Sequence, residues 1–165
     1  MAAKFKTPNN MVWHYAPWAH LPAIVRSGAL TPSNAVATEE RPLLWFSANK
    51  KWEPTATKLL TTSAGLIQMT FKQQAEQFGC IRFGLSADDT RLLNWMEACS
   101  AGGTTKEKRL ALEKTGKRMG GDPKHWFAIA TEVQLTELHF QLWAEGWHDT
   151  TGPKDMSEVW TKARG

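Results

Sequence analysis

The stretch that most constrains the fold runs from Leu43 to Lys58 and reads LLWFSANKKWEPTATK. Its first four residues are apolar or aromatic, and a proline precedes them while a polar loop starts at Asn49. This pattern is typical of a buried strand that ends in a loop. We therefore expect Ser47 at the mouth of a sheet. Glu53 and the Pro-Thr step behind it favour a helix that continues through Leu60.

The loop behind this predicted strand is both cationic and aromatic, since Lys50, Lys51 and Trp52 follow one another. A strand that ends in such a loop is a common place to hold an anionic ligand with a flat ring. The alternative is a core strand followed by a solvated lysine pair. The loop by itself is compatible with both interpretations.

Length and charge set the broad class. With 165 residues the chain is long enough for one domain with its own core, and its formal net charge of +4 favours an anionic partner only weakly. Cys80 and Cys99 have no CxxC spacing and no clustered histidines, so we expect buried thiols and no metal site. No apolar run has the length of a signal peptide or a membrane span, and we expect a cytoplasmic protein without membrane contact.

Tryptophan is unusually frequent, with nine residues against one tyrosine. The tryptophans are scattered and follow no repeat, so we expect most of them in the core. A few are expected to line a site where a base or a nicotinamide ring stacks.

Alternation and helical spacing predict a single α+β domain over residues 1–165, with a partly frayed tail from His148. The expected strands cover 11–15, 43–47, 80–85, 125–133 and 138–144. The expected helices cover 19–27, 72–78 and 106–119, with another through Leu92 to Met96 that Ser86, Asp88 or Asp89 caps.

Common catalytic motifs are absent, because the sequence contains no P-loop, GxGxxG, GxSxG or HExxH pattern. The candidates for chemistry are therefore dispersed. His14 and Tyr15 lie on the first predicted strand, Ser47 lies on the second, and an acid lies near a late strand.

Four segments carry a resemblance to known proteins, namely WHYAP, HLPAIVRSGALTP, LLWFSANKKWEPTA and DPKHWFAIATEVQL. Together they resemble a bacterial and phage group whose opening halves are similar to the ADP-ribosyltransferase fold. From Trp13 to about Lys58 the chain is also similar to DNA-modifying ADP-ribosyltransferase toxins and RNA 2′-phosphotransferases. The resemblance implies a bent, split pair of sheets with short helices and with NAD in the cleft.

The same resemblance assigns roles to residues of the first two strands. It implies that His14 takes the family's first position, beside the ribose or diphosphate of NAD, and that Tyr15, Trp45 or Phe46 stacks on nicotinamide. Ser47 would support the neighbouring strand. Each has a structural alternative, as a polar strand end for His14 and Ser47 and as core aromatics for the others.

Charged residues complete the predicted site. Arg26, Lys50 and Lys51 are expected to meet the diphosphate, although lysine pairs in loops are most often simply solvated. Glu132 is the expected catalytic acid, because a carboxylate beside the ribose can stabilise its developing positive charge and deprotonate a nucleophile. Glu53 and Glu137 are its competitors.

Two functions remain open at this point. The first is NAD-dependent ADP-ribosyl transfer to a nucleic acid or protein acceptor. The chain lacks the arginine-leading motif of the Arg-Ser-Glu toxins and a complete Arg and His signature of the phosphotransferases. The second function is therefore a non-catalytic module that binds nucleic acid or a nucleotide, such as a phage protein that acts on a host factor.

Overall fold

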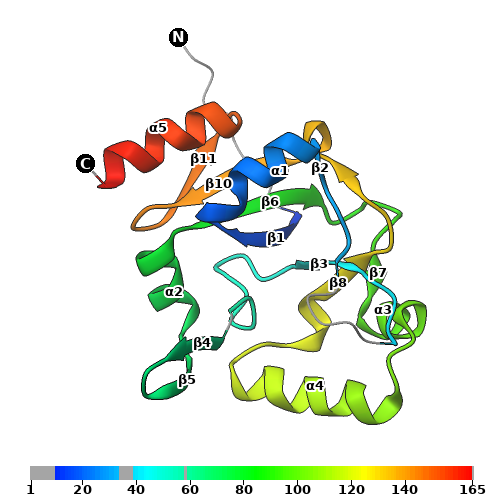
Figure 1. Ribbon diagram of the computed structural model, residues 1–165. Helices are drawn as coiled ribbons and strands as arrows, with labels where there is room; N and C mark the ends of the chain where they lie inside the picture. Colours follow the sequence, from blue (N-terminus) through cyan, green and yellow to red (C-terminus); the bar gives the residue numbers. More distant parts are fainter. Residues whose placement is uncertain (1–9, 34–38, 58, 165) are drawn as a thin grey trace.

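A computed structural model of the protein describes residues 10–33, 39–57 and 59–164. These residues form one α+β domain in which a seven-stranded, antiparallel sheet has the order β11-β10-β6-β1-β3-β8-β7 (Figure 1). Two small two-stranded sheets, β2-β9 and β4-β5, accompany it. The predicted single α+β domain is confirmed for the described residues.

The strands are β1 Met11–Pro17, β2 Ala29–Leu30, β3 Leu44–Ser47, β4 Leu59–Thr62, β5 Gly65–Gln68, β6 Cys80–Ser86, β7 Leu93–Asn94, β8 Trp126–Ile129, β9 Val133–Gln134, β10 His139–Trp143 and β11 Trp147–Thr150. The α-helices are α1 Leu21–Ser27, α2 Phe71–Phe78, α3 Trp95–Gly102, α4 Lys106–Arg118 and α5 Pro153–Arg164.

The sheet separates two layers. Helices α1 and α5 lie on one side of β1, β6 and β10, whereas α2 and α4 lie on the other side (Figure 1). All seven strands belong to one sheet, but β1 and β3 meet in a single registered pair, Trp13 with Ser47. The sheet is therefore weakly joined between its β1 half and its β3 half.

The side under α1 and α5 is an apolar core. Val12, Ile81, Phe83 and Leu142 are all fully buried there, and Met156 of α5 packs onto them. Because side chains alternate across a strand, the intervening residues of the same strands face the opposite layer.

The predicted helix after Trp52 is wrong. Pro54 and Thr55 form a turn, and the chain continues into the β4–β5 hairpin, where Thr62 pairs with Gly65. The local reason is that the Glu53 carboxylate accepts a hydrogen bond from the Thr55 amide and closes a turn in place of a helix.

Two further boundaries differ from the prediction. The expected strand 125–133 ends at Ile129, after which the chain bends so that Val133 pairs with Leu30 of β2. The expected helix through Leu92 to Met96 begins only at Trp95, because Asn94 caps it and forms a reciprocal capping box with Glu97.

From Trp147 to Arg164 the chain forms one strand and one helix, in the region for which the sequence predicts a partly frayed tail. Strand β11 pairs with β10, and helix α5 follows it. Two apolar residues that hold α5 are Met156, which is fully buried, and Trp160, whose ring stacks on Trp18 at 4.7 Å between centroids. Helical spacing of these two residues was the signal that the prediction missed.

Candidate functional site

A cavity of about 580 Å³ lies between the sheet and helix α4. Strands β1, β3 and β8 form one wall of the cavity. The loop after β3 forms a second wall, and helix α4 forms a third. Four tryptophans line it, and they are Trp13, Trp45, Trp95 and Trp126. Trp45 remains 40% exposed, which is high for an indole that contacts its neighbours. Large, open apolar cavities with a few polar groups are the usual form of a ligand site.

Three of these indoles form a continuous series. The ring centroids of Trp45 and Trp95 are 5.7 Å apart, and those of Trp95 and Trp126 are 5.1 Å apart in an edge-to-face arrangement. The Trp95 indole N–H donates to Glu113 of α4 at 2.7 Å, which fixes its ring. The faces of indole rings carry negative potential and attract cations and flat rings.

A buried carboxylate belongs to the same wall. Glu53 lines the cavity and is only 5% exposed. Its Oε2 accepts from the Ser47 hydroxyl at 2.6 Å, and its Oε1 accepts from the Thr55 hydroxyl at 2.6 Å. The Trp126 indole N–H donates to Oε1 at 3.1 Å, and the Thr55 amide donates to it at 3.3 Å. Four hydrogen bonds of this length hold the buried carboxylate in one orientation.

A second buried charge lies on the same face of the sheet. The Arg82 guanidinium is sandwiched between the rings of Trp13 and Trp147, at 4.1 and 4.0 Å from their centroids. Its Nε donates to Gln141 at 2.7 Å, and its Nη1 donates to the Lys50 carbonyl at 3.2 Å. The loop that carries Glu53 is thereby tied to strand β6.

Burial and charge set the pKa values around Arg82. Burial lowers the pKa of Arg82, against the opposing effect of Tyr15. Burial raises the pKa of Tyr15 to about 12 and that of the Cys80 thiol to about 12, while Arg82 lowers both. Both groups are therefore neutral at pH 7, and Cys80 is an unreactive thiol.

His14 has a different environment from the one expected for a ligand-binding residue. Its ring lies on the apolar side of the sheet, 5.9 Å from the ring of Phe46 and 6.5 Å from that of Phe83. Its Nδ1–H donates to the Trp45 carbonyl at 2.7 Å, across the weak β1–β3 junction. Burial lowers the pKa of His14, and the hydrogen bond only partly opposes it. The ring is a neutral link between strands at the cavity's edge.

Several predicted residues do meet at one place. The cavity is lined by His14, Tyr15, Trp45, Phe46 and Ser47, although the rings of His14 and Phe46 pack on the apolar side of the sheet. The structure also brings in Glu53, which sequence reasoning kept only as a competitor of Glu132.

The other predicted residues lie elsewhere. Glu132 is exposed between β8 and β9, where its carboxylate accepts from Gln134 at 3.2 Å, and Glu137 pairs with Arg91. Arg26, on α1, is exposed on the opposite side of the sheet. None of the three is part of the described cavity wall.

The two predicted lysines of the loop contribute mainly their backbone. The carbonyls of Lys50 and Lys51 accept from Arg82, and the Lys51 ammonium lies 4.6 Å above the Trp52 ring. Neither lines the described part of the cavity. Lys108 of α4 does line it, and its ammonium pairs with Glu40 at 2.7 Å.

Sequence reasoning missed Arg82 and the distant tryptophans that complete the wall. An arginine in the middle of an otherwise apolar strand, CIRFGL, was the available signal for Arg82. The positions of Trp95 and Trp126 depend on strand order, for which the sequence carries no local signal.

Searches for related proteins give no family, since no family model, curated protein or solved structure matches the chain. Within the described ranges, no helix is both long and apolar enough to cross a membrane. The same residues contain no group of three or more His, Cys, Asp or Glu side chains that could hold a metal ion.

Proposed function

We propose that the protein uses NAD as an ADP-ribosyl donor, with the nicotinamide ring in the tryptophan-lined cavity and Glu53 as the acidic residue. The observation that carries the proposal is the buried Glu53 carboxylate in the wall of a cavity with four indoles. Oxidised nicotinamide is flat and positively charged. Indole faces and a carboxylate both attract such a ring.

The chemistry follows from the same arrangement. The bond between the ribose carbon and the nicotinamide nitrogen breaks, and nicotinamide leaves with the electron pair. Positive charge then develops on the ribose, where a fixed carboxylate stabilises it. The acceptor's nucleophilic atom forms the new bond to the ribose carbon, and its proton passes to Glu53 or to water.

Glu53 supports this role better than Glu132 because of its surroundings. Four hydrogen bonds hold its carboxylate in the cavity wall, so it needs no reorganisation when charge develops. Glu132 is exposed to solvent, which screens its charge. The acceptor is proposed as a nucleic acid or a protein.

A second candidate is a non-catalytic module that binds a base or nucleotide. One observation favours it, namely that Lys108 is the only lysine or arginine in the described cavity wall and already pairs with Glu40. A diphosphate normally meets several cationic or amide donors. A ligand that inserts a single ring into the cavity would not require them.

The test is release of nicotinamide from NAD by the purified protein, alone and with single-stranded nucleic acid as acceptor. Glu53→Gln is compared with Glu132→Gln, which makes the same change at an exposed site. We expect turnover by the wild type, a loss of at least about a hundredfold in Glu53→Gln, and little change in Glu132→Gln. Turnover that survives Glu53→Gln contradicts the assignment, and saturable NAD or base binding without any turnover selects the second candidate.

A further inference from the structure

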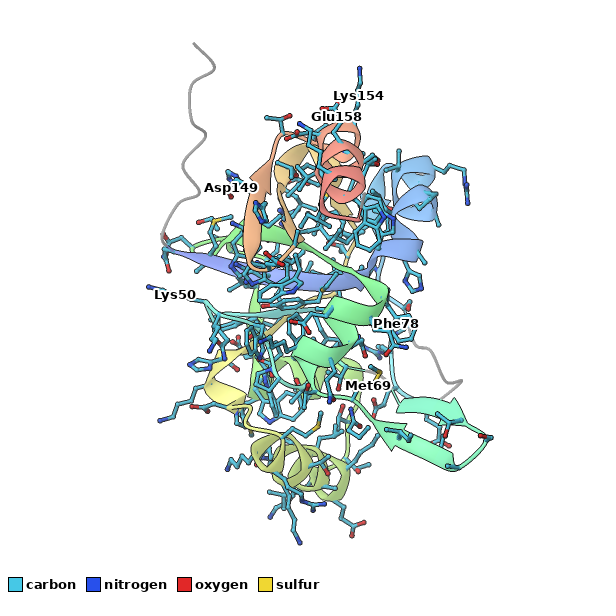
Figure 2. The ribbon with its side chains drawn as sticks, turned by 90° about the vertical axis from the view of Figure 1, so that its left-hand side faces the viewer. Lys50, Met69, Phe78, Asp149, Lys154 and Glu158 are labelled. Atoms are coloured by element: carbon cyan, nitrogen blue, oxygen red, sulfur yellow. The ribbon has the colours of Figure 1, made fainter. Side chains whose placement is uncertain are left out.

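The β4–β5 hairpin projects from the body of the molecule below helix α2 (Figure 2). Among the described residues it pairs with no strand of the main sheet. Leu66 is 67% exposed and its neighbour Ile67 is 45% exposed. Because adjacent strand residues point to opposite faces, both faces of β5 are uncovered. A two-stranded hairpin on its own is at best marginally stable in water.

The sequence of the hairpin has none of the usual protection of an exposed strand. Residues 59–71 read LLTTSAGLIQMTF and contain no charged residue and no proline. Natural proteins normally protect such edges with lysine, proline, bulges or a covering element. A segment of this composition is a template for pairing with another strand.

The register identifies which edge is open. Thr62 pairs with Gly65 and Leu60 pairs with Ile67, around a two-residue turn. In such a hairpin the hydrogen-bonded and non-hydrogen-bonded pairs alternate from the turn outward. The backbone N–H and C=O groups of Leu66 and Gln68 therefore point away from β4. Along the sequence β4 is preceded by Lys58, whereas two uncharged residues, Met69 and Thr70, follow β5.

We propose that this β5 edge pairs antiparallel with the β5 edge of a second copy of the chain, which gives a four-stranded sheet across a two-fold axis. Such a contact is self-complementary, since each copy presents the same strand. The uncharged edge offers nothing to nucleic acid or to a highly charged peptide, whose binding depends on charge. An equally uncharged, apolar strand of the same length is present on every other copy.

The placement of the hairpin suits this contact. In both views it extends from the body apart from the lysine-rich helix α4 (Figures 1 and 2). Two copies that each carry a net charge of +4 can therefore meet there without bringing their basic helices together. Paired four-residue strands bury less than a standard interface, so we expect a reversible dimer with a dissociation constant on the order of 10–100 µM.

The test is sedimentation velocity of the full chain from about 1 µM to about 1 mM, which brackets that constant. Leu66→Lys places a charge on the open edge. Leu110→Lys is the matched control, because Leu110 on α4 is also an exposed leucine, at 48%, and the charge change is the same. We expect the wild type and Leu110→Lys to shift from monomer to dimer, and Leu66→Lys to weaken dimerisation at least about tenfold. Matching thermal melts at low concentration establish that the variants are folded.

Amide hydrogen exchange adds a readout at the edge itself. We expect the Leu66 and Gln68 amides to gain protection as the protein concentration rises, whereas exposed amides of α4 do not. A wild type that stays monomeric throughout overturns the proposal and leaves the edge for a strand of another protein. A dimer that Leu66→Lys does not weaken overturns it as well, because its interface then lies elsewhere.

Discussion

The two faces of the seven-stranded sheet are built on opposite principles. Under α1 and α5 the face is apolar, and Val12, Ile81 and Phe83 are fully buried there. On the other face the same strands carry Trp13 and Arg82, and β3 carries Ser47, which is 2% exposed and bonded to Glu53. The first face therefore buries apolar side chains, whereas the second face buries charged side chains.

The difference shows where the chain retains groups that are costly to bury. A buried guanidinium or carboxylate lowers stability unless hydrogen bonds replace its hydration, and an apolar side chain of similar size would avoid that cost. Arg82 and Glu53 are both satisfied in this way, and both are linked to the loop that bounds the cavity. Positions of this kind are more often retained for binding or catalysis than for stability.

The largest effect is expected on the apolar face. Phe83→Ala removes a fully buried ring that contacts Phe140 at 5.5 Å between centroids. We expect the free energy of unfolding to fall by about 3–5 kcal/mol, from lost burial and the remaining cavity. Urea unfolding measures this change. If the two faces are independent, NAD affinity of the folded fraction stays the same, and a large loss of affinity would show that they are coupled.

A somewhat smaller effect on stability is expected from Arg82→Met on the other face. The change removes the guanidinium that now donates to the Gln141 side-chain oxygen Oε1 and to the Lys50 backbone carbonyl. A hydrogen bond to a charged group contributes about 1.5–3 kcal/mol, and we expect a net loss of about 2–3 kcal/mol in urea unfolding. In contrast to Phe83→Ala, this change frees the loop before Glu53, so ligand affinity should fall more than about tenfold. Unchanged affinity would show that the loop does not need Arg82.

Gly116→Ala tests the packing of the cavity wall. Gly116 is buried in α4, and a Cβ there would overlap the Trp126 ring. Overpacking of this kind costs about 1–3 kcal/mol, and the better helix propensity of alanine returns about 1 kcal/mol. We expect a small net loss in thermal stability together with a clear loss of ring binding, because Trp126 also holds Glu53. Gly103→Ala is no substitute as a control, since Gly103 has a left-handed φ of 73°.

A control for Gly116→Ala is Ser157→Ala on α5, an exposed position on the opposite layer. It should leave ring binding unchanged. Equal binding losses in the two variants would contradict a specific role for the Trp126 wall.

The smallest expected effect is a pH dependence of stability. It comes from His14, a polar residue on the apolar face of the sheet. The pKa of His14 in the folded protein lies below its ordinary value of 6.5, so the unfolded chain binds the proton more tightly. The His14 contribution to stability is therefore complete above pH 6.5 and is lost as pH falls from 6.5 towards the folded pKa. The slope reaches at most about 1.4 kcal/mol per pH unit.

Chemical unfolding at a series of pH values between 5 and 8, chosen around the ordinary histidine pKa of about 6.5, measures this slope. His14→Gln can keep a donor to the Trp45 carbonyl and should flatten the pH dependence. His20→Gln makes the same change at an exposed position and serves as the control. A pH dependence that is the same in wild type and His14→Gln contradicts the burial of a neutral His14.

Sequence reasoning located the elements whose signals are local. Alternation predicted β1, β6 and β10, and helical spacing with caps predicted α1, α2 and α4 close to their observed bounds. The helix predicted after Trp52 was wrong because the Glu53 carboxylate accepts a hydrogen bond from the Thr55 amide and closes a turn there. Helix propensities do not account for such a hydrogen bond between a side chain and the backbone. The order of the strands, which joins β1 to β3 and β3 to β8, is a long-range property with no local signal.

The candidate site was predicted in part for the same reason. Aromatic residues and Ser47 around β3 line the cavity, and they belong to one continuous stretch of sequence. The acid was assigned to Glu132 because strand 125–133 was expected to continue to it, whereas the chain bends after Ile129. The cation at the centre of the polar face, Arg82, is placed by hydrogen-bond partners on two other strands, Tyr15 of β1 and Gln141 of β10, which no single stretch encodes.

The most direct test of the central claim is calorimetric titration of the protein with NAD and with its reduced form. The two ligands share every group except the charge and saturation of the nicotinamide ring. A cavity with four indoles and the Glu53 carboxylate should prefer the positively charged oxidised ring by about tenfold or more, and Glu53→Gln should reduce that preference while Glu132→Gln leaves it unchanged. Equal affinity for both forms, or no binding of either at millimolar concentration, would contradict the account.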